Sequence, residues 1–192
     1  MRRSLASCQN AVPWFWKPAV RIIGHPLLND FARRYPDAAR SLSDWAGHIR
    51  SQPIGNFAEL RNAFGSADVV GQCIVFNIRG NRYRLIAQVG FADRVCHVKA
   101  ILTHAAYDRR KWMKHTAVKD SLGSGWPEIV PRTTMPPITG EADHAFATSV
   151  LEYLGDHGAT QEGSAHRPLY RLLFDAIYDY EQVHCPLDFL TA

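Results

Sequence analysis

The chain has 192 residues and is 46% hydrophobic, which is enough to bury a core, so it is not disordered as a whole. No apolar run approaches the ~18 residues that a membrane-crossing helix needs. The chain has four cysteines, Cys8, Cys73, Cys96 and Cys185, and they lack the spacing of a zinc site. We therefore expect reduced thiols in the cytoplasm, no metal and no other cofactor.

The formal net charge of +4 conceals a division of the chain near Met113. Residues 1–112 hold 17 Lys and Arg against 7 Asp and Glu, a balance of +10, whereas residues 113–192 hold 5 against 11, a balance of −6. A basic segment favours a polyanionic partner. An acidic segment on the same chain could compete with that partner for the same surface.

Residues 1–19 are expected to form an appended, mobile leader, translated from an upstream start codon. Two arginines near the start are not followed by the continuous apolar core of a secretion signal, because polar residues and prolines interrupt it. One alternative stays open at this point: Trp14, Phe15 and Trp16 could dock on the folded domain.

The folded part is predicted to begin with a short strand at Val20–Gly24. Apolar residues with helical spacing then predict one helix over residues 27–35 and a second over residues 37–49. Asn56 is a suitable N-cap for a short third helix. We expect these helices to cover one face of the sheet that follows.

Three strands with two-residue alternation follow, at residues 74–78, 83–89 and 95–102, and consecutive strands should pair antiparallel. Gly80-Asn81 predicts a hairpin of type II′, because that turn needs a positive φ at its first central residue. The apolar face of these strands should pack under the helices, which makes the domain α+β. The opposite face is expected to be an open cationic surface that carries Asn77, Arg82, Arg84, Gln88, His97 and Lys99.

Glycines and prolines interrupt every period in residues 113–137, which we interpret as a linker. Helical spacing returns in residues 141–154 and again from Pro168 onward. Two amphipathic helices are too little to fold alone, so we expect residues 138–192 to pack on another surface. The expected organisation is thus a leader (1–19), a basic domain (20–112), the linker and an acidic helical segment (138–192).

A compact group of titratable side chains follows the last strand, at His104, Tyr107 and Asp108. These residue types can exchange protons when the 2′-hydroxyl of an RNA attacks its own phosphate, and Arg82, Arg84 or Lys99 can stabilise the charge that develops. Such a reaction needs no metal, and DNA lacks the nucleophile. The same spacing also fits an ordinary helix start capped by Thr103, which is the commoner case.

Specific motifs carry a resemblance. The run Val75-Phe76-Asn77-Ile78-x-Gly80-Asn81-x-Tyr83-Arg84-Leu85 precedes Thr103-His104-x-x-Tyr107-Asp108, and Phe64-x-Ser66-Ala67-Asp68 precedes both. In these motifs the span from about Val20 to Trp112 resembles the HigB-type toxins of bacterial toxin–antitoxin systems, members of the RelE-like group of ribosome-dependent mRNA interferases.

The resemblance implies a small RelE-like α+β domain, with an N-terminal strand and helices packed on the antiparallel meander. It also implies a basic surface that enters the ribosomal A site, and metal-independent cleavage of the mRNA held there. The implied catalytic residues are His104, Tyr107 and Asp108. The expected RNA-binding residues are Asn77, Arg79, Asn81, Arg82, Arg84 and Lys99.

Residues 113–192 resemble, more weakly, the N-terminal part of a HigA-type antitoxin, through the Glu141-Ala142-Asp143 helix start and the Leu172–Pro186 run. The helix-turn-helix domain of such antitoxins does not follow, so we expect no binding to operator DNA. The expected partners are mRNA on the ribosome, and either a HigA-type antitoxin or the acidic segment of the same chain. Two rivals remain: a non-catalytic binding protein derived from a toxin–antitoxin fusion, and a pure RNA-binding module.

Overall fold

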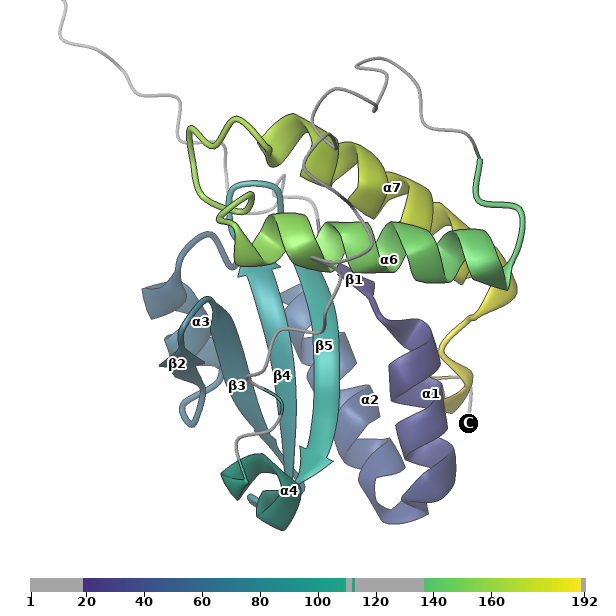
Figure 1. Ribbon diagram of the computed structural model, residues 1–192. Helices are drawn as coiled ribbons and strands as arrows, with labels where there is room; N and C mark the ends of the chain where they lie inside the picture. The colour runs from purple at the N-terminus through teal and green to yellow at the C-terminus, as the bar shows by residue number, and fades with distance from the viewer. Residues whose placement is uncertain (1–18, 110–111, 113–136, 191–192) are drawn as a thin grey trace, which may run out of the picture.

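In the computed structural model, residues 19–109, 112 and 137–190 are described (Figure 1). The predicted leader lies outside these residues except for its last position, and the predicted linker except for residue 137. Within the described part, no helix is both long enough and apolar enough to span a bilayer.

The first half of the chain forms the predicted strand, three helices and a sheet. The elements are β1 (Arg21–Ile23), α1 (His25–Arg34), α2 (Pro36–Ser51), α3 (Phe57–Ala63), β2 (Asp68–Val70), β3 (Cys73–Ile78), β4 (Tyr83–Gly90) and β5 (Val95–Thr103). After β5 come α4 (His104–Asp108), α6 (Glu141–Asp156), α7 (Arg167–His184) and the 3-10 turn η4 (Asp188–Leu190). The predicted α+β class, with a helical C-terminal segment, is confirmed.

The five strands form one sheet in the order β1-β5-β4-β3-β2. Strands β3, β4 and β5 pair antiparallel as predicted, and β1 adds to β5 in parallel. The edge strand β2 was not predicted from the sequence. It pairs with Cys73–Val75 of β3. With three residues, β2 is too short for an alternation of apolar and polar residues to be recognised in the sequence.

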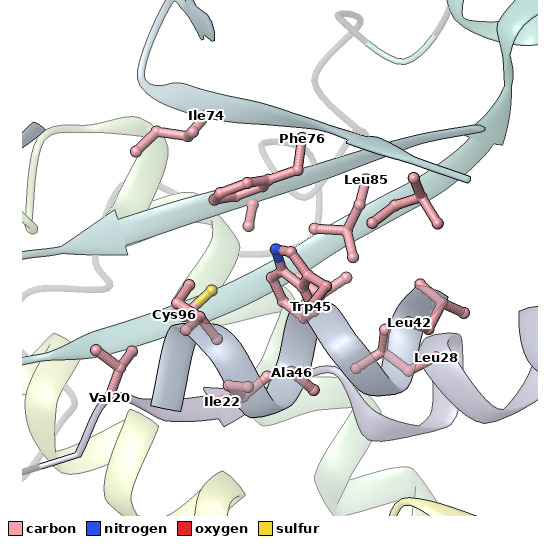
Figure 2. Packing of buried hydrophobic residues seen from close by; sticks show 14 of the residues in the cluster. Val20, Ile22, Leu28, Leu42, Trp45, Ala46, Ile74, Phe76, Leu85 and Cys96 are labelled. Carbon is pink, nitrogen blue, oxygen red and sulfur yellow. The ribbon is translucent and has the colours of Figure 1, made fainter. Parts of the chain in front are cut away.

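One face of the sheet packs on α1 and α2, as the apolar spacing predicted. Figure 2 shows Trp45 of α2 below Phe76 of β3, and their ring centroids are 5.5 Å apart. The same core includes Leu28 of α1 and Cys96 of β5, both fully buried. Burial raises the pKa of the Cys96 thiol to about 12, so this cysteine is a packing residue and not a reactive thiolate.

The turn between β3 and β4 differs from the predicted type II′ hairpin. Arg79, Gly80 and Asn81 have φ values of 51°, 57° and 82°, and the amide of Arg82 donates to the carbonyl of Arg79 at 3.2 Å. Both central residues, Gly80 and Asn81, therefore have positive φ, as in a type I′ turn. Asparagine tolerates this region better than most residues, which explains why the turn needs only one glycine.

The opposite face of the sheet is not the open cationic surface that was predicted. Helices α6 and α7 cross one end of β4 and β5 and cover that part of the face (Figure 1). Their apolar residues form a second core with Ile23 and Val95 of the sheet. Gln88 and His97 are fully buried beneath them. The α6 carbonyl of Gly155 accepts from Gln88 Nε2 at 2.8 Å, so a polar side chain is buried with a partner from a distant segment.

Charged pairs accompany this packing. Lys99 of β5 pairs with Asp156 of α6 at 2.5 Å, and Arg21 of β1 pairs with Asp175 of α7 at 2.5 Å. The acidic helices thus meet basic residues of the sheet. The expectation that the two helices pack on another surface is confirmed, and that surface is the second face of the sheet.

Candidate nucleic-acid interface

The group after β5 begins at the N-terminus of α4. Thr103 caps this helix, since its side-chain oxygen accepts from the amide of Ala106 at 3.3 Å. The amide of His104 donates to the carbonyl of Arg82 at 3.1 Å, which ties the start of α4 to the β3–β4 hairpin. The segment is therefore a capped helix start, and it holds titratable side chains beside the hairpin. The catalytic role of those side chains stays a prediction.

His104 and Asp108 lie one turn apart on α4 and contact each other. The distance between His104 Nδ1 and Asp108 Oδ2 is 2.8 Å, and the side chains are 47% and 58% exposed. When the carboxylate accepts a hydrogen bond from Nδ1, the lone pair of the neutral imidazole lies on Nε2, where it can accept a proton. The pair is therefore an accessible, oriented acid–base group.

Tyr107 lies within an aromatic and cationic stack. Its ring stacks on Trp112 with centroids 5.2 Å apart and an interplanar angle of 19°, and the Arg84 guanidinium carbon is 5.7 Å from the ring centroid. The Trp112 indole also donates to the Tyr107 carbonyl at 3.2 Å. Trp112 was not identified from the sequence as a residue of this site. An aromatic residue four positions after Asp108 could have indicated it.

The hairpin brings further predicted RNA-binding residues to the same end of the sheet. Arg84 donates to the carbonyl of Asn81 at 2.9 Å, and Asn77 lies directly opposite Arg84 in the β3–β4 register. Paired residues on adjacent antiparallel strands share a face. Asn77, Asn81 and Arg84 are thus grouped next to α4.

Arg79 and Arg82 have an acidic partner that the sequence did not reveal. Both form ion pairs with Asp37, at the start of α2, and the Arg82 distance is 3.1 Å. Asp37 also accepts a hydrogen bond from the buried Tyr83 hydroxyl at 3.0 Å. One carboxylate therefore partly neutralises two of the predicted RNA-binding cations and anchors the hairpin to α2.

Lys99 is the predicted RNA-binding residue that the structure separates from the others. It lies toward the middle of β5, is only 17% exposed, and pairs with Asp156 of α6. Figure 1 shows α4 at one end of β5 and α6 crossing near the other end. The described C-terminal helices consequently contact the Lys99 region and leave the side chains of His104 and Asp108 exposed.

This end of the sheet combines an oriented imidazole, a phenol, carboxylates and guanidinium groups, which suits proton transfer next to a phosphate. Within the described ranges, no group of three or more His, Cys, Asp or Glu side chains is placed to hold a metal ion.

Comparison with known proteins places this site within a family. A family described as a "RelE-like toxic component of a toxin-antitoxin system" matches residues 38–110, which include the hairpin and α4 but not α6 or α7. The chain is 28% identical over 92 residues to the mRNA interferase toxin HigB of Escherichia coli K12, a match that covers 46% of this chain and 88% of that relative. It is 30% identical over 93 residues to the mRNA interferase HigB of Escherichia coli O6:H1, covering 47% of this chain and 90% of the relative.

Proposed function

Because the chain belongs to the HigB family of RelE-like toxins from toxin–antitoxin systems, we propose that it is an mRNA interferase that cleaves mRNA on the ribosome without a metal. The single observation that supports this best is the exposed His104–Asp108 pair on α4, beside the Arg84–Tyr107 contact. The family model matches residues 38–110, which include these residues, and the relatives named mRNA interferases match just under half of the chain.

In the proposed reaction, the 2′-hydroxyl of a bound nucleotide attacks the adjacent phosphorus and displaces the 5′-oxygen of the next nucleotide. His104 takes the proton of the 2′-hydroxyl, with its imidazole oriented by Asp108. Tyr107 or the protonated imidazole returns a proton to the leaving oxygen. Each well-placed group of this kind contributes about 10²- to 10⁴-fold in rate.

Arg84 is a cation beside this chemistry, because its guanidinium lies over the Tyr107 ring. We propose that it stabilises the additional negative charge on the phosphate in the transition state. Asn77 and Asn81 would hold the RNA beside it, and Arg79 and Arg82 would contact neighbouring phosphates in competition with Asp37.

The C-terminal helices are proposed to restrain activity, in place of or in addition to a HigA-type antitoxin. Their described part does not extend to α4, so direct blocking of His104 is not the proposed means. Asp156 instead holds Lys99, a predicted phosphate contact, in an ion pair. On this view Asp156→Asn should increase RNA affinity and cleavage, whereas Asp179→Asn, an equivalent change at an exposed site on α7, should not.

The central experiment uses the full chain with His104→Ala and Asp108→Ala variants, and His166→Ala as a control at an exposed histidine. We expect the unaltered chain and the control to cleave mRNA on translating ribosomes and arrest growth, and both site variants to lose cleavage by at least ~100-fold. If growth arrest persists in the site variants without cleavage, the non-catalytic binding protein is the better description. If ribosome-bound mRNA stays intact with the unaltered chain and with Asp156→Asn, the enzyme proposal fails.

A further inference from the structure

The sheet has an open edge next to the hairpin. Strand β2 pairs with Cys73–Val75 of β3 and ends there, so no strand among the described residues pairs with the outer side of residues 76–78 of β3. Helix α2 and the end of α3 lie beside this edge. A pocket of about 300 Å³ is formed between them, which we call the edge pocket; its lining includes Ser41, Asp44, His48, Phe64, Asn77 and Arg79.

One wall of the edge pocket is a fixed aromatic surface. The Phe64 ring makes an edge contact with His48, with centroids 5.0 Å apart at 86°, and another with Phe76 at 5.1 Å and 76°. His48 Nε2 lies 3.1 Å from the carbonyl of Ala63, which holds the imidazole beside that ring. A planar ligand would therefore meet a wall that does not need to reorganise.

The remaining lining combines apolar and polar residues. Trp45 and Ile78 are apolar, whereas Ser41 and Asp44 of α2 add hydroxyl and carboxylate groups, and Asn77 of β3 is a further lining residue. The carboxylate of Asp44 disfavours a phosphate but can accept hydrogen bonds from the amino group of a nucleobase. Aromatic surface for stacking and polar groups for the base edge are the combination by which proteins read single-stranded RNA.

The edge pocket is also close to the catalytic group along the sheet. Asn77 pairs directly with Arg84 on β4, and Arg84 contacts Tyr107 after β5. Two strand spacings, about 10 Å, separate β3 from β5. An RNA strand bound at α4 can thus cross the hairpin and bring a neighbouring base to the open edge, where Arg79 would contact its phosphate in competition with Asp37.

We propose that the edge pocket binds the base of a nucleotide that neighbours the cleaved one, and that it prefers bases with an exocyclic amino group over uracil. This inference rests on the proposed function, since it takes RNA bound at α4 as its starting point. It assigns base selectivity to Ser41 and Asp44 of α2, which lie outside the motifs that carry the family resemblance, together with Phe64, which begins one of those motifs.

The test measures binding by fluorescence anisotropy with the full chain. The probes are a short labelled oligouridylate and the same oligonucleotide with one adenine, cytosine or guanine, all with 2′-deoxy sugars at the central positions so that they cannot be cleaved. We expect an amino-bearing base at one position to raise affinity about 5- to 50-fold over uracil. Asp44→Ala removes the acceptor and should reduce this ratio to about twofold or less, and Asp179→Ala, at an exposed site on α7, should leave it unchanged.

The inference is overturned if Asp44→Ala retains the base preference of the unaltered chain, or if the unaltered chain has no preference at any position. A second variant, Ser41→Ala, alters a residue on the same helix as Asp44 and should weaken the preference without affecting folding, because Ser41 is a partly exposed helix residue. Cleavage of ribosome-bound mRNA is measured separately. Cleavage with an unaltered base profile in Asp44→Ala refutes the pocket alone, whereas base-dependent binding without cleavage refutes the enzyme proposal alone.

Discussion

Glu181 belongs to α7, yet its carboxylate caps a helix at the other end of the sequence. Its oxygens accept from the amide of Gly24 at 2.8 Å, from the amide of His25 at 3.0 Å and from Nε2 of His144 at 2.9 Å, and its side chain is 1% exposed. Helix α1 has no acidic residue in its first turn and no capping side chain of its own. Glu181 therefore supplies the charge and the acceptors that the N-terminus of α1 needs.

The expected cost of replacing this residue follows from those contacts. Glu181→Ala leaves two backbone amides and one imidazole without an acceptor in a buried site. A buried donor that loses its partner costs ~1–3 kcal/mol, and removal of one member of a buried charged network typically costs ~3–5 kcal/mol in total. Glu181→Gln keeps one acceptor oxygen, so we expect its loss to be smaller, about 1–3 kcal/mol.

The assay is urea unfolding of the full chain, followed by circular dichroism at constant pH. Asp179→Asn is the matched control, because it removes a carboxylate from an exposed site on the same helix and should change the free energy of unfolding by less than ~0.5 kcal/mol. If the free energy of unfolding of Glu181→Ala is within about 1 kcal/mol of that of the unaltered chain, Glu181 does not stabilise the N-terminus of α1 as proposed. Strict additivity with His144→Ala would likewise contradict a shared network.

Other predictions concern the sheet and the hairpin. Gly155→Ala should lower the free energy of unfolding by ~1–3 kcal/mol despite alanine's higher helix propensity. The new Cβ would lie 2.1 Å from Gln88 Oε1 and displace the buried hydrogen bond between Gln88 and the Gly155 carbonyl. The urea midpoint should fall accordingly, and the loss should be smaller in a Gln88→Ala background. Burial lowers the pKa of His97 to about 3, so the folded state binds fewer protons than the unfolded state below pH 6.5. The contribution of neutral His97 to stability is thus complete above pH 6.5 and is lost as the pH falls toward 3, by up to ~1.4 kcal/mol per pH unit. In urea titrations at several pH values, His97→Gln should remove that part of the dependence of the free energy of unfolding on pH. Asp37→Ala should cost ~1–2 kcal/mol in thermal or urea unfolding, because the Tyr83 hydroxyl loses its acceptor. The same change frees the two hairpin arginines, so the slope of log affinity for single-stranded RNA against log salt should become more negative by up to ~1.4; an unchanged slope would show that these arginines do not contact RNA.

Local chemistry accounts for the elements that were predicted correctly. Asn56 caps α3 by accepting from the amide of Glu59, and Thr103 caps α4 in the same way. Caps and alternating strands depend on residues within a few positions of one another, so a single sequence is sufficient to recognise them. The residues His104, Tyr107 and Asp108 were grouped for the same reason, since one short helix carries all three.

The incorrect expectation about the second face had a different origin. Gln88 and His97 are polar and alternate with apolar neighbours, so the pattern indicated exposure. Their burial depends on α6, which follows β5 by some forty residues and supplies the Gly155 carbonyl that accepts from Gln88. A polar side chain is stable in a core when it has such a partner, and alternation along a strand contains no information about partners from distant segments.

The amino-acid sequence was sufficient to predict the α+β class, the antiparallel meander, the capped helix with its titratable group and the membership in the toxin family. Those properties follow from short-range spacing and from motifs. Other features became visible in the folded chain: the acidic helices pack over Lys99 and leave α4 exposed, Asp37 pairs with both hairpin arginines, and an open edge of β3 forms a pocket beside the site. Each of these depends on contacts between residues far apart in the chain, where packing geometry selects one partner among many compatible charges.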